Sequence, residues 1–101
     1  MKLYNAKLLT ITCEILAQNN VIDILHKHHI SGYTFYEVSG SGAKGIRGQG
    51  FQNEKNIKIE VILQEEKLSD ILEEIARTLF SDYAIITYVS DVGVIRTEKF
   101  V

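Results

Sequence analysis

The chain has 101 residues, 46% of them hydrophobic and 24% charged, and its formal net charge is −2. These totals are typical of one globular domain, and they exclude a protein that binds nucleic acid or another polyanion through a broadly basic surface. The single cysteine, Cys13, excludes an internal disulfide, and no segment approaches the roughly 20 apolar residues of a membrane span.

The first half of the chain predicts a strand, a helix and a second strand. Apolar and polar residues alternate over 6–12, which indicates a strand. Over 13–30 the spacing changes to three or four residues, which predicts a helix whose inner face carries Ile15, Ile22, Leu25 and His29. Residues 33–39 are rich in aromatic and β-branched side chains and predict the second strand.

The second half predicts a strand, a helix and one or two further strands. Strict alternation over 57–63 indicates a third strand. Residues 65–80 predict an amphipathic helix, because apolar side chains recur at i, i+3, i+4, i+7 and i+11 as Leu68, Ile71, Leu72, Ile75 and Leu79. Residues 83–89 predict a fourth strand, and residues 93–100 a short fifth.

This order predicts an α+β fold of the ferredoxin-like type, β-α-β-β-α-β, as a single domain over residues 1–101. Two helices are expected to cover one face of a four-stranded antiparallel sheet. The opposite face would carry Tyr36, Ile62 and Tyr88, which are too apolar to remain in water. We therefore expect this open face to be covered in an oligomer.

The stretch "SGSGAKGIRGQG" holds five of the chain's seven glycines and two cations, Lys44 and Arg47. It contains G-x-G-x-x-G, but a dinucleotide-binding turn must lead directly into a helix, and here a strand follows. A Walker loop fails for the same reason, and Gly45 stands where that motif requires serine or threonine. The stretch therefore belongs to neither of these phosphate-binding motifs.

What remains is a connection over about 40–55 between two antiparallel strands. Structureless connections of this length are usually functional or disordered. Its glycines would let backbone N–H groups approach an anion, and Lys44 and Arg47 would supply charge. A flexible linker has a similar composition, so both interpretations stay open on composition alone.

Other functions receive less support. The histidines in "HKHH" could hold a metal, but they also suit the end of a helix, where cations are favoured. An RNA-binding sheet would need aromatic residues on the first and third strands, and there are none. No arrangement of serine, cysteine, histidine and carboxylate predicts an enzyme. We expect a protein that is not an enzyme, with no resident metal and no nucleic-acid partner.

"GYTFYEVSGSG", the long connection, "NIKIEVIL" and "VIR" resemble the P-II signal-transduction family over nearly the whole chain. "KGIRGQG" and "FSDYAIITYV" are similar to one branch, the P-II-like regulators of the sodium-dependent bicarbonate transporter (SbtB-like). The resemblance implies a homotrimer with adenine nucleotides in clefts between subunits. It also implies that residues 40–55 form the T-loop, which contacts a target protein.

The resemblance assigns a role to each candidate residue. Thr34 would recognise the adenine, and Ile62 would pack on it. The backbone of Gly40 and Gly42 would lie beside the phosphates, with charge supplied by Lys44, Arg47 and Arg96. The loop before the fourth strand would line the site from the neighbouring subunit through Asp82, Tyr83 and Ala84.

The departures from the family pattern are informative. Ala84 stands where nitrogen-sensing members carry the lysine that holds the γ-phosphate of ATP, and Arg96 is followed by Thr97 without a second arginine. The loop has no tyrosine for modification. We therefore expect AMP or cyclic AMP to compete well with ATP.

The sequence thus predicts a cytoplasmic P-II-like regulator, peripheral at the inner membrane when bound to its target. The expected target is a membrane transporter of the bicarbonate type. Two alternatives are a carboxysome-associated P-II-like sensor of AMP or ADP, and a trimeric metal-tolerance protein of the same fold. The metal-tolerance trimer would not need the glycines and cations of residues 40–55, and that feature favours a nucleotide regulator.

Overall fold

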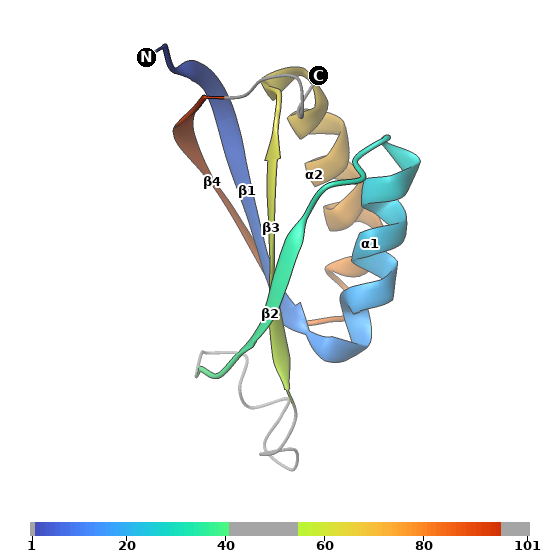
Figure 1. Cartoon of the computed structure of the whole chain (residues 1–101). Helices are drawn as coiled ribbons and strands as arrows, with labels where there is room; N and C mark the ends of the chain where they lie inside the picture. The colour runs from blue at the N-terminus through green and yellow to red at the C-terminus, as the bar shows by residue number, and fades with distance from the viewer. Residues whose placement is uncertain (1, 41–54, 96–101) are drawn as a thin grey trace.

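The computed structural model describes residues 2–40 and 55–95 (Figure 1). One four-stranded antiparallel sheet, in the order β2-β3-β1-β4, carries both long helices on the same face. The elements follow the predicted order and are β1 Tyr4–Glu14, the 3-10 turn η1 Ile15–Ala17, α1 Gln18–Lys27, β2 Thr34–Val38, β3 Asn56–Leu63, α2 Glu65–Leu79 and β4 Ile85–Val94. The predicted α+β architecture of the ferredoxin-like type is confirmed.

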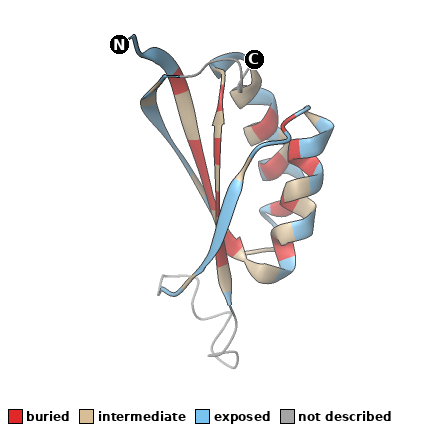
Figure 2. Ribbon diagram, viewed as in Figure 1, coloured by how far each residue is buried: buried red, intermediate tan, exposed pale blue. Residues whose placement is uncertain are grey.

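The core lies between the sheet and the helices (Figure 2). In β3 every second side chain is buried, and Ile59, which pairs with Ile11 of β1 and Phe35 of β2, has no exposed surface. In α2 the predicted apolar stripe is confirmed, since Ile71 and Ile75 are fully buried. Fully burying one such side chain contributes about 1.5–3 kcal/mol, so this interface dominates the stability of the single chain.

The predicted helix over 13–30 was wrong at its start and in its inner face. Cys13 continues β1, where it pairs with Ile57 and Ile85, and the helix proper begins only at Gln18. Because Cys13 is paired within the sheet with strands on both sides, the chain stays extended here, although the local spacing of its apolar residues favours a helix. The side chains of α1 that are buried are Val21, Ile24 and Leu25, so the predicted stripe is correct only at Leu25.

Two further boundaries differ from the predictions. The fourth strand runs on to Val94 because β1 extends far enough to pair with it, Tyr4 facing Val94. Gly93 and Val94, which were expected to begin a fifth strand, therefore belong to β4. The remainder of that expected strand, from Arg96 onward, lies outside the described residues.

The end of α1 forms a Schellman motif. The amide of Ile30 donates to the carbonyl of Leu25 at 2.8 Å, and the amide of His29 donates to that of His26 at 3.0 Å. His29 takes the left-handed conformation that this motif requires, with φ of 65°. Glycine adopts that conformation without steric cost, whereas a side chain adds strain.

His29→Gly is therefore expected to raise the free energy of unfolding by about 0.5–1 kcal/mol. Urea denaturation followed by circular dichroism measures the change. Asp23→Gly is the matched control: Asp23 is exposed in the middle of α1, where glycine should destabilise the helix. Equal losses of stability in the two variants would contradict this account of the helix end.

Glu74 joins the two helices. Its carboxylate contacts His28 Nε2 at 2.8 Å and Lys27 Nζ at 2.9 Å, and only 12% of its side chain is exposed. The hydrogen bond to His28, followed by that to Lys27, lowers the pKa of Glu74 from its ordinary value of 4.5. His28 and Lys27 therefore support the packing of α1 on α2.

Because the pKa of Glu74 is lowered on folding, its ionisation stabilises the native state above pH 4.5, and this contribution is lost as pH falls through the native pKa. Wild type should be more stable than Glu74→Gln at pH 7, and the difference should shrink below pH 4.5. Urea titrations at several pH values measure it. The matched control is Glu73→Gln, an exposed neighbour; identical pH profiles for both variants would refute the role of Glu74.

Candidate nucleotide site

The long connection and the loop before β4 meet at one end of the sheet. β2 enters the connection at Val38 and β3 leaves it at Asn56. At this end the amide of Ile15 donates to the carbonyl of Lys55 at 3.0 Å, and the amide of Glu14 donates to that of Ala84 at 3.3 Å. Figure 1 shows the turn into β4 and the base of the connection at the same lower end of the molecule.

The three residues predicted before β4 differ in their surroundings. Asp82 is exposed, whereas Ala84 is half-buried. The ring of Tyr83 packs against the core, and its hydroxyl accepts a hydrogen bond from Asn20 Nδ2 at 3.2 Å. The amides of Asp82 and Tyr83 both donate to the carbonyl of Leu79, which closes the end of α2. The side chain of Tyr83 is therefore a structural support within its own chain.

Thr34 and Ile62 lie together on the open face, away from that end. Thr34 pairs with Glu60, and Ile62 pairs with Leu8 in the adjacent strand pair. Along β2, Thr34 is separated from Val38 by four residues, or about 13 Å. Within one chain the described residues of the predicted set thus form two groups. Thr34 and Ile62 make up an adenine group, and Gly40 with the loop from Asp82 to Ala84 makes up a loop group toward the other end of β2.

Gly40 is the one loop-base glycine among the described residues of the predicted set. It is exposed, and a Cβ atom there would meet nothing within 4 Å. The single chain does not itself require glycine at this position, so the proposed close approach of a ligand remains a prediction. Gly42, Lys44, Arg47 and Arg96 lie outside the described residues.

The open face carries a polar cluster among exposed apolar side chains. The Tyr36 hydroxyl donates to Glu60 Oε2 at 3.1 Å, and Lys58 Nζ lies 6.0 Å from the centre of the Tyr36 ring. A hydrogen bond with the hydroxyl of Tyr88 raises the pKa of Lys58, which keeps this amine charged. The face can therefore offer both apolar contacts and fixed charge to another surface.

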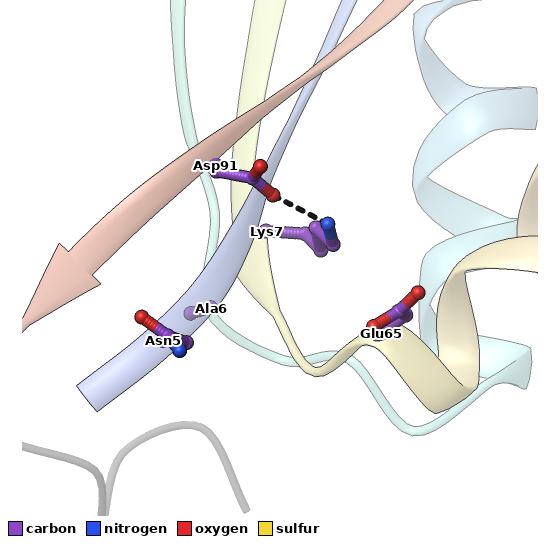
Figure 3. Close-up of a pocket in the computed structure, with 5 residues that line it drawn as sticks. All are labelled: Asn5, Ala6, Lys7, Glu65 and Asp91. Carbon is purple, nitrogen blue, oxygen red and sulfur yellow. Dashed lines mark hydrogen bonds and ion pairs between the residues drawn. The ribbon is translucent and has the colours of Figure 1, made fainter.

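A separate hollow of about 330 Å³ lies at the far end of β1, remote from residues 40 and 55 (Figure 3). Its lining residues are Asn5, Ala6, Lys7, Glu65 and Asp91. Lys7 and Asp91 form an ion pair across it, and the hydrogen bond to Asp91 raises the pKa of Lys7. Because one cation, Lys7, faces two carboxylates, Glu65 and Asp91, the hollow does not suit a polyanion such as a nucleotide.

Within residues 2–40 and 55–95, no three side chains of histidine, cysteine, aspartate or glutamate gather as a metal site. Over the same ranges no helix combines the length and the apolar character needed to cross a membrane.

Comparison with known proteins gives the family. Residues 6–99 match the family described as nitrogen regulatory protein P-II, so the chain belongs to the P-II family. A PII-like signalling protein of Thermus thermophilus is 36% identical with a TM-score of 0.81, and all of both chains is covered. The predicted family is thereby confirmed, and family members are signalling proteins.

Two further similar structures are of CPII from Thiomonas intermedia. CPII bound to ADP, AMP and acetate has a TM-score of 0.85 at 28% identity, with 99% of this chain and 98% of CPII covered. CPII bound to ADP and bicarbonate has a TM-score of 0.84 at 29% identity, with 98% and 97% covered. The resemblance to regulators of the bicarbonate transporter remains a prediction.

Proposed function

We propose that this chain is a homotrimeric P-II-like regulator that binds AMP, cyclic AMP, ADP or ATP in the clefts between its subunits. The adenine lies near Thr34 and Ile62 of one subunit. The phosphates meet the Gly40 and Gly42 backbone and the charges of Lys44, Arg47 and Arg96, and the loop from Asp82 through Tyr83 to Ala84 lines the cleft. The residues contributed by the two subunits come from opposite ends of the sheet.

The observation that carries this proposal is the division of the described candidate residues between the two ends of β2. Thr34, in the adenine group, is separated along β2 by about 13 Å from Val38, the end of the strand at which the loop group lies. Pairing one end of one chain with the other end of its neighbour brings both groups to a single ligand. The nucleotides in CPII, which this chain matches over nearly its full length, support the ligand class.

The open face supports the assembly. Tyr36, Tyr88 and Ile86 lie on it, with 41%, 46% and 65% of their surfaces exposed in the single chain. Contiguous apolar surface of this kind marks an interface between proteins, and closed symmetric homo-oligomers are the common solution.

Signalling is proposed to pass through the T-loop, residues 40–55. The nucleotide is proposed to contact the base of this loop in just one of the loop's conformations. Binding then raises the population of that conformation and changes the affinity for a target. The proposed target is a membrane transporter of the bicarbonate type, to which the cytoplasmic trimer binds at the inner membrane. The bicarbonate bound in a CPII structure supports a link between this kind of protein and bicarbonate.

Isothermal titration with AMP, cyclic AMP, ADP and ATP, with and without magnesium, tests the proposal. Without a lysine at Ala84 to hold the terminal phosphate, ATP lacks a charge-assisted hydrogen bond of roughly 1.5–3 kcal/mol. We expect binding that depends little on the number of phosphates. If ATP bound more than tenfold tighter than AMP, the expected similarity of the affinities would be refuted. If none of the four nucleotides bound, the proposed function would be refuted.

A further inference from the structure

We propose that Asn20 is a positioning residue for the nucleotide site and that it acts through Tyr83. The inference rests on the proposed function, in which the loop from Asp82 to Ala84 lines the cleft. Asn20 lies in the first turn of α1, and its Nδ2 donates to the hydroxyl of Tyr83 at 3.2 Å, across 63 residues of sequence. The bond joins α1 directly to the middle of this loop.

The loop is held at three points. At its start, the carbonyl of Leu79 accepts the amides of Asp82 and Tyr83 at 3.1 and 3.0 Å. At its end, the carbonyl of Ala84 accepts the amide of Glu14. Both of these contacts involve the backbone at the margins of the loop. The third, from Asn20, fixes a side chain at its centre.

The identities of Tyr83 and Asn20 indicate that this third contact does more than fill space in the core. The Tyr83 ring already lies against the core, and a phenylalanine would fill the same space. Asparagine is a poor helix former because its amide competes with the backbone for hydrogen bonds. A tyrosine hydroxyl and a helical asparagine at this one point are together explained by the bond between them.

The bond orients the residues on either side of Tyr83. With the phenol ring held at both its core face and its hydroxyl, the backbone of Asp82 and Ala84 has less freedom to move relative to α1. A ligand that binds a preorganised loop does not have to order it, and its affinity is higher for that reason. Loss of the bond should therefore weaken nucleotide binding while leaving the fold intact.

The test measures AMP dissociation constants by isothermal titration for Tyr83→Phe, Asn20→Ala and the double variant, well below their melting temperatures. Each single variant is expected to bind AMP about 2- to 10-fold more weakly, as loss of one hydrogen bond implies. The double variant should bind no more weakly than the weaker single variant, because the same bond is removed. Thr78→Ala is the control: its hydroxyl donates to the Glu74 carbonyl on α2, outside the loop, and its loss should leave AMP binding unchanged.

If wild type binds AMP and Tyr83→Phe binds it equally well, the positioning role is overturned and the proposed function stands. Lower melting temperatures with unchanged affinity would make the bond purely structural and would also overturn it. Additive losses in the double variant would show that Asn20 acts by another route. Wild type that does not bind AMP would overturn the proposed function and, with it, this inference.

Discussion

Ile86→Asp is expected to convert the proposed trimer into a monomer and to abolish AMP binding. Ile86 is 65% exposed in the single chain, so aspartate there should leave the fold of one subunit intact. Within a subunit interface the same carboxylate would be buried without a partner, at a cost of several kcal/mol for each subunit. Light scattering coupled to size exclusion should report about 11 kDa, in place of about 34 kDa for three copies of the 11.4 kDa chain.

Ala76→Asp provides the matched control for that experiment. Ala76 is exposed on α2, which covers the face of the sheet opposite to the open face. The same charge placed there should leave the trimer and its AMP affinity unchanged. A trimeric Ile86→Asp protein, or a monomeric one that binds AMP like wild type, would contradict an assembly through the open face.

Arg47→Ala is expected to weaken AMP binding by about 1.5–3 kcal/mol, which is roughly 10- to 150-fold. The reason is loss of a charge-assisted hydrogen bond to phosphate. Because adenosine carries no phosphate, its weaker binding should not change between wild type and variant. Isothermal titration with both ligands separates a phosphate contact from a general effect on the site.

Arg77→Ala is the control for the arginine variant. Arg77 is exposed in the last turn of α2, and its removal makes the same change in net charge outside residues 40–55. It should bind AMP like wild type. If Arg47→Ala also binds AMP normally, residues 40–55 return to the linker interpretation.

The fold was largely predictable because its decisive elements have strong periodicity. The helix α2 and the strand β3 were predicted within a residue or two, since nearly every apolar side chain in them faces the core. The extended conformation of Cys13 and Glu14 was not predicted, because it is determined by pairing with distant strands. Cys13 sits between Ile57 and Ile85, and no local pattern reports those partners.

The candidate site was predictable in its residues but not in its arrangement. A family resemblance supplied Thr34, Ile62 and the loop from Asp82 to Ala84 as one set. The strand register divides that set between two ends of the sheet, and register depends on pairing across the whole fold. The hydrogen bond from Asn20 to the Tyr83 hydroxyl was missed, although an asparagine in a helix offered a signal, because the two residues are 63 positions apart in the sequence.

Each nucleotide site is proposed to be assembled from two chains. Native mass spectrometry of the wild-type protein with increasing AMP tests it most directly, since it reports subunit and ligand numbers together. The account predicts a trimer of about 34 kDa, three times 11.4 kDa, that takes up as many as three AMP molecules, with none on any monomer. A monomer that carries AMP, or a trimer that takes up none, would contradict it.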